Sequence, residues 1–381
     1  MNGQNQKILK RFHKDIATLK AHHWKNFFDL YQGCLHNCIY CLYRYDENFG
    51  KNITPISKVN TSRLAKELDN VKPVGITYLG ATSDIYQPVE KRMELVRPIL
   101  SVFCEKRLPL VIATKSLLIR RDIDLLSQLA RDGLIEVSIT MITLDEGFAK
   151  FLEPGAPVPK DRLNIARELT SNGIPVSFHV APLIPGYFND VSLREFITAL
   201  QKTGASGAYG CILGMRRPYK ENVLESIRII DSALAEYLSE IYGSTDGSNA
   251  VSPLTQVVFA EMERFSRICK DCGFEFYCEH IPPLDTNTRM GGIFRFKLPT
   301  TGDMYRHFKE QGKQEVIFDD LEEYLANFSA VDVEYRSLVV SFWQAGILFQ
   351  DTDLVPIGIE PEKYVFTDSI KLKVGEVMTC D

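Results

Sequence analysis

The sequence lacks any stretch of eighteen or more uncharged apolar residues, so we expect no membrane-spanning helix. The N-terminus is polar and rich in lysine, and no apolar segment precedes a small-residue cleavage site. An excess of basic residues is also missing. The formal net charge is −5, which disfavours a protein that coats nucleic acid, because phosphates are held by concentrated Lys and Arg. We therefore expect a cytoplasmic protein without a membrane partner, in which a local basic channel is still compatible with the charge.

The number and spacing of the cysteines disfavour a disulfide framework. Nine cysteines is an odd number, and Cys34, Cys38 and Cys41 crowd into eight positions. Metal ligation in a reducing compartment explains this spacing better.

The apolar pattern predicts an α/β fold. Apolar runs typical of buried parallel strands alternate with segments of helical periodicity. The strands are expected at 27–31, 75–80, 108–114, 135–140, 176–183 and 207–213, and the helices at 61–70, 90–104, 121–132, 160–172 and 192–203. Gly133 and Gly173 stand where helix C-caps are expected. Six β-α units joined by right-handed crossovers indicate a partial (β/α)6 barrel of the TIM type.

We divide the chain into four parts. Residues 1–26 are a lead-in, 27–220 the barrel core, 221–297 a helical extension that packs on the core, and 298–381 a small C-terminal α+β domain of unknown role. The extension is expected to contain helices at 221–242 and 254–270, a Gly/Ser-rich linker at 243–249 and a strand at 275–279.

The central motif is the CxxxCxxC loop from Gly33 to Cys41, directly after the first strand. Fully ligated iron–sulfur clusters use four cysteines, so three cysteines leave one iron open to another ligand. A loop after a barrel strand opens at the carboxyl-terminal face, where barrel enzymes assemble their active sites. The alternative is a structural zinc site with His36 as fourth ligand. His36 lies within the three-residue gap, where the loop would have to fold back on itself, so we expect it to be a solvated loop residue.

The spacing of the motif, with Tyr40 just before its last cysteine, resembles the radical S-adenosylmethionine (radical SAM) superfamily. Within it, the sequence is most similar to the spore photoproduct lyase-like group, also called DNA repair photolyase-like. The sequence segments that carry this resemblance are 80–90, 114–116, 153–154 and 181–186. The resemblance covers roughly residues 27–215.

This resemblance implies a [4Fe–4S] cluster on Cys34, Cys38 and Cys41, whose open iron is chelated by S-adenosylmethionine. It also implies a lyase- or oxidoreductase-type enzyme in which a 5′-deoxyadenosyl radical takes hydrogen from a substrate. The protein would orient the cofactor and exclude side reactions. A low-potential donor, flavodoxin or ferredoxin, is the implied electron partner.

The resemblance further suggests which residues hold S-adenosylmethionine. Thr82, Ser83 and Asp84 are expected near its amino group, and Lys115 and Ser138 near its carboxylate, where a lysine provides a compact positive charge. By period-two alternation, Ser138 shares one strand face with Thr140. Tyr40 completes the candidate cofactor-binding residues of this half of the barrel.

Three residues on later strands are weaker candidates. His179 would relay a proton or orient the substrate, although a satisfied core histidine is an equally good interpretation. Arg216 would bind a ribose hydroxyl or an anionic group, or is a surface charge. Cys211 would donate a hydrogen atom, although most buried cysteines are small core residues, as we expect of Cys104.

A second cysteine group lies further along the chain. Cys269, Cys272 and Cys278, with His280 close behind, have spacing that suits an auxiliary cluster or zinc. We favour a structural interpretation, in which Cys269 ends a helix, Cys272 belongs to its cap and Cys278 lies on the next strand.

The sequence leaves the substrate open among a nucleic-acid lesion, a peptide and a small metabolite. An auxiliary cluster would favour the peptide, whereas the acidic balance weakens the nucleic-acid alternative. A noncatalytic iron–sulfur sensor or scaffold is the alternative outside enzymes.

Overall fold

The structure is a computed structural model. It describes residues 10–11, 26–44, 54–55, 61–69, 76–242, 250–251, 253–278, 289–290, 301–327, 333–346, 348–349, 354–358 and 361–366. No helix within these ranges is both long and apolar enough to cross a membrane.

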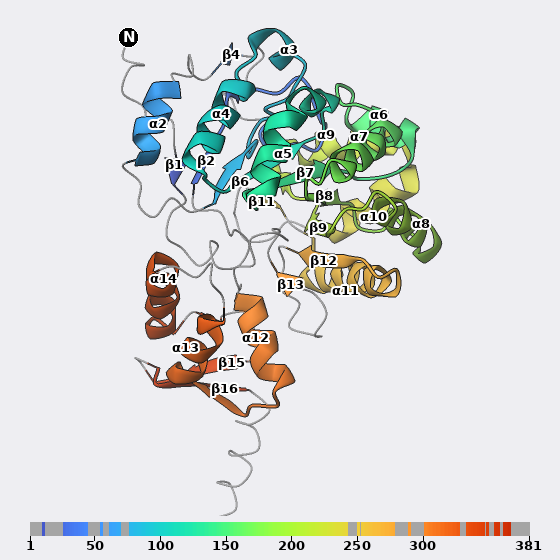
Figure 1. Cartoon of the computed structure of the whole chain (residues 1–381). Helices are drawn as coiled ribbons and strands as arrows, with labels where there is room; N and C mark the ends of the chain where they lie inside the picture. The colour runs from blue at the N-terminus through green and yellow to red at the C-terminus, as the bar shows by residue number, and fades with distance from the viewer. Residues whose placement is uncertain are drawn as a thin grey trace, which may run out of the picture.

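A curved sheet forms the centre of the molecule (Figure 1). Its order is β1-β2-β5-β6-β7-β8-β9-β12-β13, with β1 antiparallel to β2 and all the other pairs parallel. This confirms the α/β partial-barrel prediction. The strands are β1 (Lys10–Arg11), β2 (Asn26–Phe28), β5 (Thr77–Leu79), β6 (Leu110–Thr114), β7 (Ile135–Thr140), β8 (Val176–Leu183), β9 (Gly207–Ile212), β12 (Glu275–Cys278) and β13 (Arg289–Met290).

The structure confirms the six predicted strands of the partial barrel. The six predicted strands correspond to β2 and β5 to β9, but β12 and β13 continue the parallel sheet beyond β9. Strand β12 follows a helix and buries Phe276, as the earlier strands bury their apolar residues. The first strand is also shorter than predicted, because the chain leaves the sheet after Phe28 and forms a small antiparallel pair, β3 (Tyr31–Gln32) with β4 (Thr54–Pro55).

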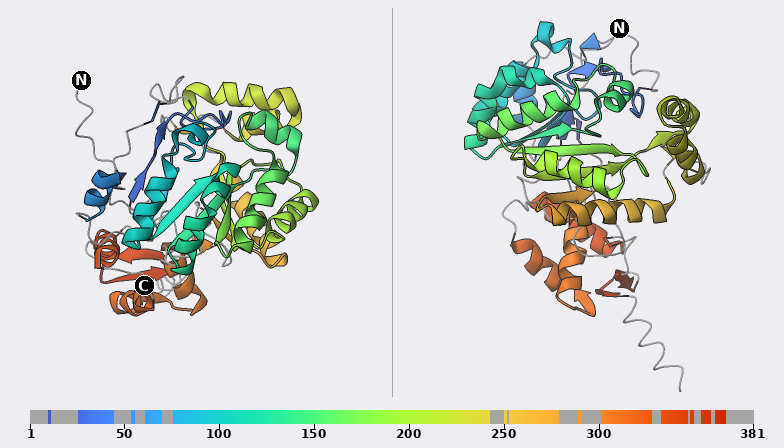
Figure 2. Two further views of the ribbon diagram at one scale, coloured as in Figure 1. Left: turned by 45° about the horizontal axis from the view of Figure 1, so that its top comes forward. Right: turned by 90° about the vertical axis from the view of Figure 1, so that its right-hand side faces the viewer.

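Strands β6 and β7 are buried at every position, because helices and the barrel interior cover both faces of a parallel sheet. The helices lie outside the sheet (Figure 2). They are α2 (Thr61–Asp69), α3 (Glu90–Met93), α4 (Val96–Lys106), α5 (Ile123–Arg131), α6 (Glu146–Leu152), α7 (Pro159–Ser171), α8 (Asp190–Gln201) and α11 (Thr255–Asp271). Gly133 and Gly173 have φ of 76° and 72°, as expected of helix C-caps.

The predicted single helix at 90–104 was wrong, since it is divided into α3 and α4. Glu94 ends α3 in the left-handed region with φ of 50°. The Glu90 carboxylate then accepts hydrogen bonds from the backbone N–H groups of Leu95 and Val96, at 3.0 Å each, where α4 begins. The sequence also did not predict α6, whose first turn is capped by Asp145.

The predicted helix at 221–242 is likewise two helices, α9 (Lys220–Ile230) and α10 (Ser232–Ile241). Asp231 separates them in an extended conformation and caps α10 by accepting from Leu234 N–H at 2.9 Å. Both helices belong to an apolar cluster at the carboxyl end of the barrel, against which Ile39 and Tyr40 of the cysteine loop pack. The linker at 243–249 lies outside the described residues.

A C-terminal unit follows, with elements α12 (Thr301–Glu310), β14 (Glu315–Ile317), α13 (Phe318–Ala326), α14 (Val333–Gln344), β15 (Leu354–Ile357) and β16 (Lys363–Phe366). The antiparallel sheet order β14-β16-β15 and this order of elements are those of a winged helix. Ile76 and Val111, at the amino ends of β5 and β6, share its apolar core. The unit therefore covers that end of the barrel, opposite α3 (Figures 1 and 2). The four-part division of the chain stays a prediction.

Candidate functional site

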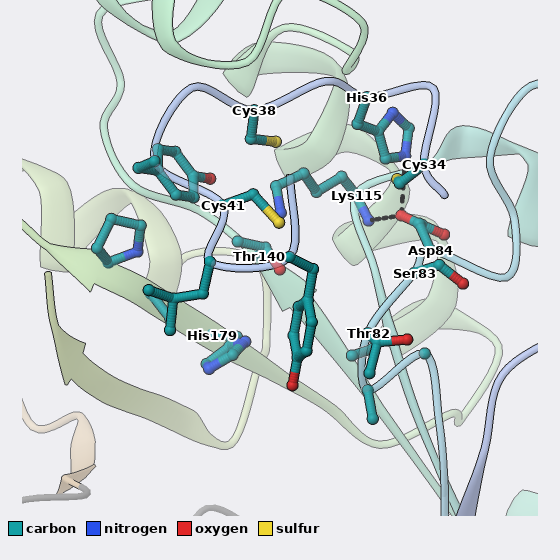
Figure 3. Close-up of a pocket in the computed structure, with 18 of the residues that line it drawn as sticks. Cys34, His36, Cys38, Cys41, Thr82, Ser83, Asp84, Lys115, Thr140 and His179 are labelled. Atoms are coloured by element: carbon teal, nitrogen blue, oxygen red, sulfur yellow. Dashed lines mark hydrogen bonds and ion pairs between the residues drawn. The ribbon is translucent and has the colours of Figure 1, made fainter. Parts of the chain in front are cut away.

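The cysteine loop lies at the carboxyl end of the sheet, over a cavity of about 610 Å³. Gly33 and Asn37 adopt φ of 82° and 52°, so two left-handed residues turn the chain on either side of Cys34. Cys34, Cys38 and Cys41 all line the cavity. In Figure 3 they lie along one side of it, and Thr82, Thr140 and His179 face them from the other.

Two neighbouring loops clamp the cysteine loop. On one side, Gln87 accepts from Leu35 N–H at 2.8 Å and donates to the Gly33 carbonyl at 3.0 Å. On the other, Gly155 N–H donates to the His36 carbonyl at 2.9 Å. The backbones approach so closely here that a Cβ on Gly155 would lie 2.0 Å from the Leu35 oxygen. Only glycine fits at position 155.

His36 is buried, so the prediction that it is a solvated loop residue was wrong. Its Nε2 lies 2.9 Å from Asp84 Oδ2, and its Nδ1 lies 3.1 Å from the Gly155 carbonyl oxygen. The ring is thus held by both flanking loops, a role that the short gap between two cysteines did not reveal.

The three thiols suit a cluster better than a single zinc ion. His36, the candidate fourth ligand of a zinc ion, directs both ring nitrogens at Asp84 and Gly155 instead. A cubane bonds each thiolate to a different iron, whereas structural zinc draws four ligands onto one ion. Burial raises the pKa of Cys34 to about 11 and that of Cys38 to about 12. Metal binding must therefore displace their protons.

Thr82 and Ser83 are oriented by hydrogen bonds in which their hydroxyl groups donate to acceptors outside the cavity lining. The Thr82 hydroxyl donates to Asp29 at 2.6 Å, and the Ser83 hydroxyl donates to the Tyr31 carbonyl at 2.8 Å. Asp29 also accepts from the Thr82 N–H at 3.0 Å. Their hydroxyl oxygens keep lone pairs, so they can accept from a positively charged amino group.

The Asp84 carboxylate lines the cavity but is fully engaged by the protein. It accepts from the backbone N–H groups of Tyr86, at 2.8 Å, and Lys115, at 2.7 Å, and from the Thr114 hydroxyl. Burial alone would raise its pKa, but His36 and these donors hold the pKa of Asp84 below its usual value. Its contact with S-adenosylmethionine stays a prediction.

Lys115 belongs to a buried charge network. Its Nζ lies 3.8 Å from Glu153 Oε1 and 6.0 Å from the centre of the Tyr40 ring. Tyr40 and the fully buried Arg162 both donate to Glu153, and Arg162 also donates to the Thr140 carbonyl at 3.1 Å. Burial alone would lower the pKa of Lys115, but the nearby Cys38 and Glu153 raise it, so the amine is protonated.

The remaining candidates are placed unequally. Thr140, His179 and Cys211 line the cavity, and His179 stacks on Tyr209 with ring centres 5.2 Å apart. Ser138 lies two residues before Thr140 on β7. It is buried and does not line the cavity. Arg216 lies on β10 (Met215–Arg216), and its side chain lies outside the described part of the chain.

The second cysteine group is only partly described. Cys269 is fully buried in the main apolar core, and Cys272 follows α11 beside Thr198, with the two side-chain heteroatoms 3.9 Å apart. The Cys278 side chain and His280 lie outside the described residues, so the structural interpretation stays a prediction. Cys104 packs against the core from α4.

Sequence reasoning missed Asp29, Gly155 and Arg162. Asp29 lies just after the first strand, a position at which barrel enzymes place polar residues. Arg162 follows Glu153 by nine residues, but nothing local marks a charge that will be fully buried. Their partners come from distant segments, which a single sequence does not pair.

Comparison with known proteins agrees with this geometry. The family profile described as the radical SAM superfamily matches residues 29–198. An uncharacterized protein of Methanocaldococcus jannaschii is 31% identical over 63% of this chain and 93% of its own length. An uncharacterized protein of Acidianus two-tailed virus is 29% identical over 55% and 75%. A mutant of spore photoproduct lyase with bound AdoMet and dinucleoside spore photoproduct has a similar fold, with a TM-score of 0.54, 16% identity, and coverage of 73% of this chain and 88% of that chain.

Proposed function

The chain belongs to the radical SAM superfamily, and from this premise we propose that it is an enzyme that takes a hydrogen atom from a substrate by reductive cleavage of S-adenosylmethionine. The observation that carries the proposal is the clamped loop, which presents Cys34, Cys38 and Cys41 to the same cavity as Lys115 and Thr82. A sensor or scaffold needs the thiols but has no use for this arrangement of polar groups.

In this proposal the three cysteines hold a [4Fe–4S] cluster. When bound and reduced, the cluster supplies the electron that cleaves S-adenosylmethionine into methionine and a 5′-deoxyadenosyl radical. A low-potential protein such as a flavodoxin or ferredoxin is the proposed source of that electron.

The protein's own residues orient the cofactor. The lone pairs of Thr82 and Ser83 accept from its amino group, and the protonated Lys115 attracts its carboxylate. Tyr40 and Glu153 keep the Lys115 amine in place without neutralising it by close contact, since 3.8 Å separates Nζ from the carboxylate. Asp84 joins the loop after β5 to the end of β6, because it accepts hydrogen bonds from the Thr114 hydroxyl and the Lys115 N–H.

In this proposal the same cavity receives the substrate. Tyr78, His179 and Cys211 also line it, and the charged lining residues Arg44, Asp84 and Lys115 lie on or next to the cysteine loop. Cys211 is the candidate donor of a hydrogen atom to a substrate radical, and His179 the candidate for orienting substrate. The lining therefore suits an uncharged reacting group.

Among nucleic acid, peptide and metabolite substrates, the composition of the C-terminal unit disfavours nucleic acid. Residues 301–366 contain thirteen Asp and Glu against five Lys and Arg. Among the described cations of this unit, Lys313, Lys363 and Arg336 each pair with a carboxylate, and Lys309 contacts Tyr305. A winged helix that bound nucleic acid would need such cations for phosphates.

The test is anaerobic reconstitution with iron and sulfide, followed by reduction with dithionite in the presence of S-adenosylmethionine. We expect about four irons per chain and formation of 5′-deoxyadenosine, measured by chromatography. The cluster and the cleavage of S-adenosylmethionine should both be lost in Cys34→Ala. Both should be kept in Cys104→Ala, because Cys104 lies on α4 and packs against the core away from the cavity. An intact cluster that neither cleaves S-adenosylmethionine nor responds to it spectrally would favour the sensor or scaffold.

A further inference from the structure

The side of the cysteine loop that faces away from the cavity is exposed and partly apolar. Leu35 is 43% exposed and, unlike its neighbours Cys34 and His36, does not line the cavity. Each of the two loops that clamp the cysteine loop adds a proline beside it, the exposed Pro88 and the half-buried Pro154. A partner that covers Leu35 therefore lies one residue from a proposed ligand of the cluster.

Cations flank the cysteine loop at the surface. Lys91 and Arg92 are exposed on α3, one turn after the first clamping loop. Next to the second clamping loop, the exposed Lys150 donates to the Pro154 carbonyl at 2.7 Å. The half-buried Arg44 donates to a carbonyl of the cysteine loop itself at 2.9 Å. Positive charge thus comes from three separate segments.

The carboxylates closest to the cysteine loop do not offset this charge at the surface. Asp84, Glu90 and Glu153 are at most 9% exposed, and contacts within the protein engage all three. The exposed Glu94 and Glu146 lie at the ends of α3 and α6 away from the clamp. On a chain of formal net charge −5, this surface is therefore locally positive.

We propose that this surface, with Leu35 at its centre and Lys91, Arg92 and Lys150 around it, is the docking site of an acidic, low-potential electron-carrier protein. The inference rests on the proposed function, which requires one electron from outside the chain for each cleavage. In the docked pair, one electron leaves the reduced carrier and reduces the cluster, and no bond is formed or broken in that step.

The position and the charge of the surface both favour a carrier. A substrate must enter the cavity, whereas a carrier needs only to approach the cluster, and Leu35 faces away from the cavity. Complementary charges at the rim of an interface speed the encounter of two proteins. A small apolar centre is sufficient, because electron-transfer complexes are among the smallest and weakest protein interfaces.

Neutral variants test the cations without touching the cavity. The test variants are the double variant Lys91→Gln/Arg92→Gln and the single variant Lys150→Gln. The matched control is Arg131→Gln/Lys202→Gln, which removes the same charge from exposed positions where α5 and α8 end, just before β7 and β9 begin at the opposite end of the barrel. None of these five residues lines the cavity.

The probe is flavodoxin, and it is used in two measurements on the cluster-loaded chain. Surface plasmon resonance measures binding of oxidised flavodoxin, and stopped-flow absorbance measures reduction of the cluster by reduced flavodoxin. At low salt we expect both the affinity and the reduction rate to fall about 10-fold in Lys91→Gln/Arg92→Gln. The loss should be smaller in Lys150→Gln and absent in the control.

Two conditions separate docking from chemistry. At about 1 M salt, where charges are screened beyond about 3 Å, the wild type and the variants should converge. Dithionite is a small reductant that needs no docking surface, so cleavage of S-adenosylmethionine driven by dithionite should be the same in all of them.

The opposite results are equally clear. If flavodoxin reduces Lys91→Gln/Arg92→Gln as fast as the wild type at low salt, the inference is overturned. An equal loss in the control would also overturn it, since net charge alone would then explain the effect. If the double variant instead loses binding of a duplex oligonucleotide or of a second copy of the chain, with normal reduction by flavodoxin, the surface has that other occupant. A cluster-loaded wild type that does not cleave S-adenosylmethionine with dithionite would overturn the proposed function, whereas flavodoxin binding still decides the docking site.

Discussion

Glu153 follows Lys150 by three residues in the sequence, but in the fold Lys150 contacts the Pro154 carbonyl and Glu153 pairs with the distant Arg162. It is fully buried and pairs with Arg162, whose side chain is 1% exposed, while Lys115 lies nearby. We expect Glu153→Gln to lower the free energy of unfolding by about 3–5 kcal/mol, because it leaves Arg162 buried without a counter-charge. Urea denaturation of the cluster-free chain measures this.

The matched control is Glu168→Gln, which breaks the exposed pair with Arg120. Solvent screens that pair, so its loss should cost about 1 kcal/mol or less. Equal losses in the two variants would mean that Glu153 does not balance buried charge.

Lys115 is the residue whose replacement should act on the cofactor rather than on the fold. Lys115→Met keeps the length of the side chain but removes the charge offered to the S-adenosylmethionine carboxylate. A hydrogen bond to a charged group contributes about 1.5–3 kcal/mol, so we expect at least about 10-fold weaker binding of S-adenosylmethionine. Equilibrium dialysis against the cluster-loaded protein measures this. Lys150→Met, which removes only an exposed contact with the Pro154 carbonyl, should bind normally. Unchanged affinity in Lys115→Met would remove Lys115 from the cofactor site.

Among the connecting elements, the loop between α6 and α7 positions the cysteine loop most closely. In Gly155→Ala, the new Cβ would collide with the backbone at Leu35 and His36, which cannot move without shifting Cys34 and Cys38. We expect this variant to reconstitute with less iron and to lose its cluster to a chelator faster. Gly147→Ala is the control, since its Cβ would meet only the Asp145 side chain at 3.2 Å and alanine favours a helix. If both variants keep their iron equally, the contact at Gly155 does not hold the cysteine loop.

The elements that could be predicted from sequence are those whose burial is regular. Strands β7 and β8 were predicted to the residue, because an apolar residue recurs at every second position of each, as Ile135, Val137 and Ile139 do in β7. Helix breaks were missed where a side chain caps a helix that starts within an apparently continuous pattern, as Glu90 and Asp231 do. Strand β12 was expected, but its place in the parallel sheet depends on pairing with β9, which no local pattern encodes.

Contacts between distant segments also limited what could be predicted about the site. The three cysteines were predicted as cluster ligands from their spacing along the chain, and Lys115 and Thr82 were predicted as cofactor-binding residues from the resemblance to a known family. The contacts of His36 and Arg162 were not, because they depend on segments that only the folded barrel brings together.

At the scale of the whole molecule, the C-terminal unit should support one side of the barrel. Ile76 and Val111 are buried in its core, and each such side chain contributes about 1.5–3 kcal/mol when buried. We expect a chain that ends at residue 300 to unfold at a lower urea concentration. Hydrogen exchange should quicken in β5 and β6 and change little in β8 and β9. Unchanged exchange in β5 and β6 would show that the unit is only attached to the barrel.

The clamp on the cysteine loop also has a consequence for the order of assembly. The loop is held by Asp84 and Gln87, 48 and 52 residues further along the chain, and by Gly155, 119 residues from His36. Contacts of such long range form late in folding, because the intervening chain must first be closed into a loop. A zinc finger folds around its metal. This chain, by contrast, must build most of its barrel first, so maturation should deliver iron and sulfide to an already folded apoprotein.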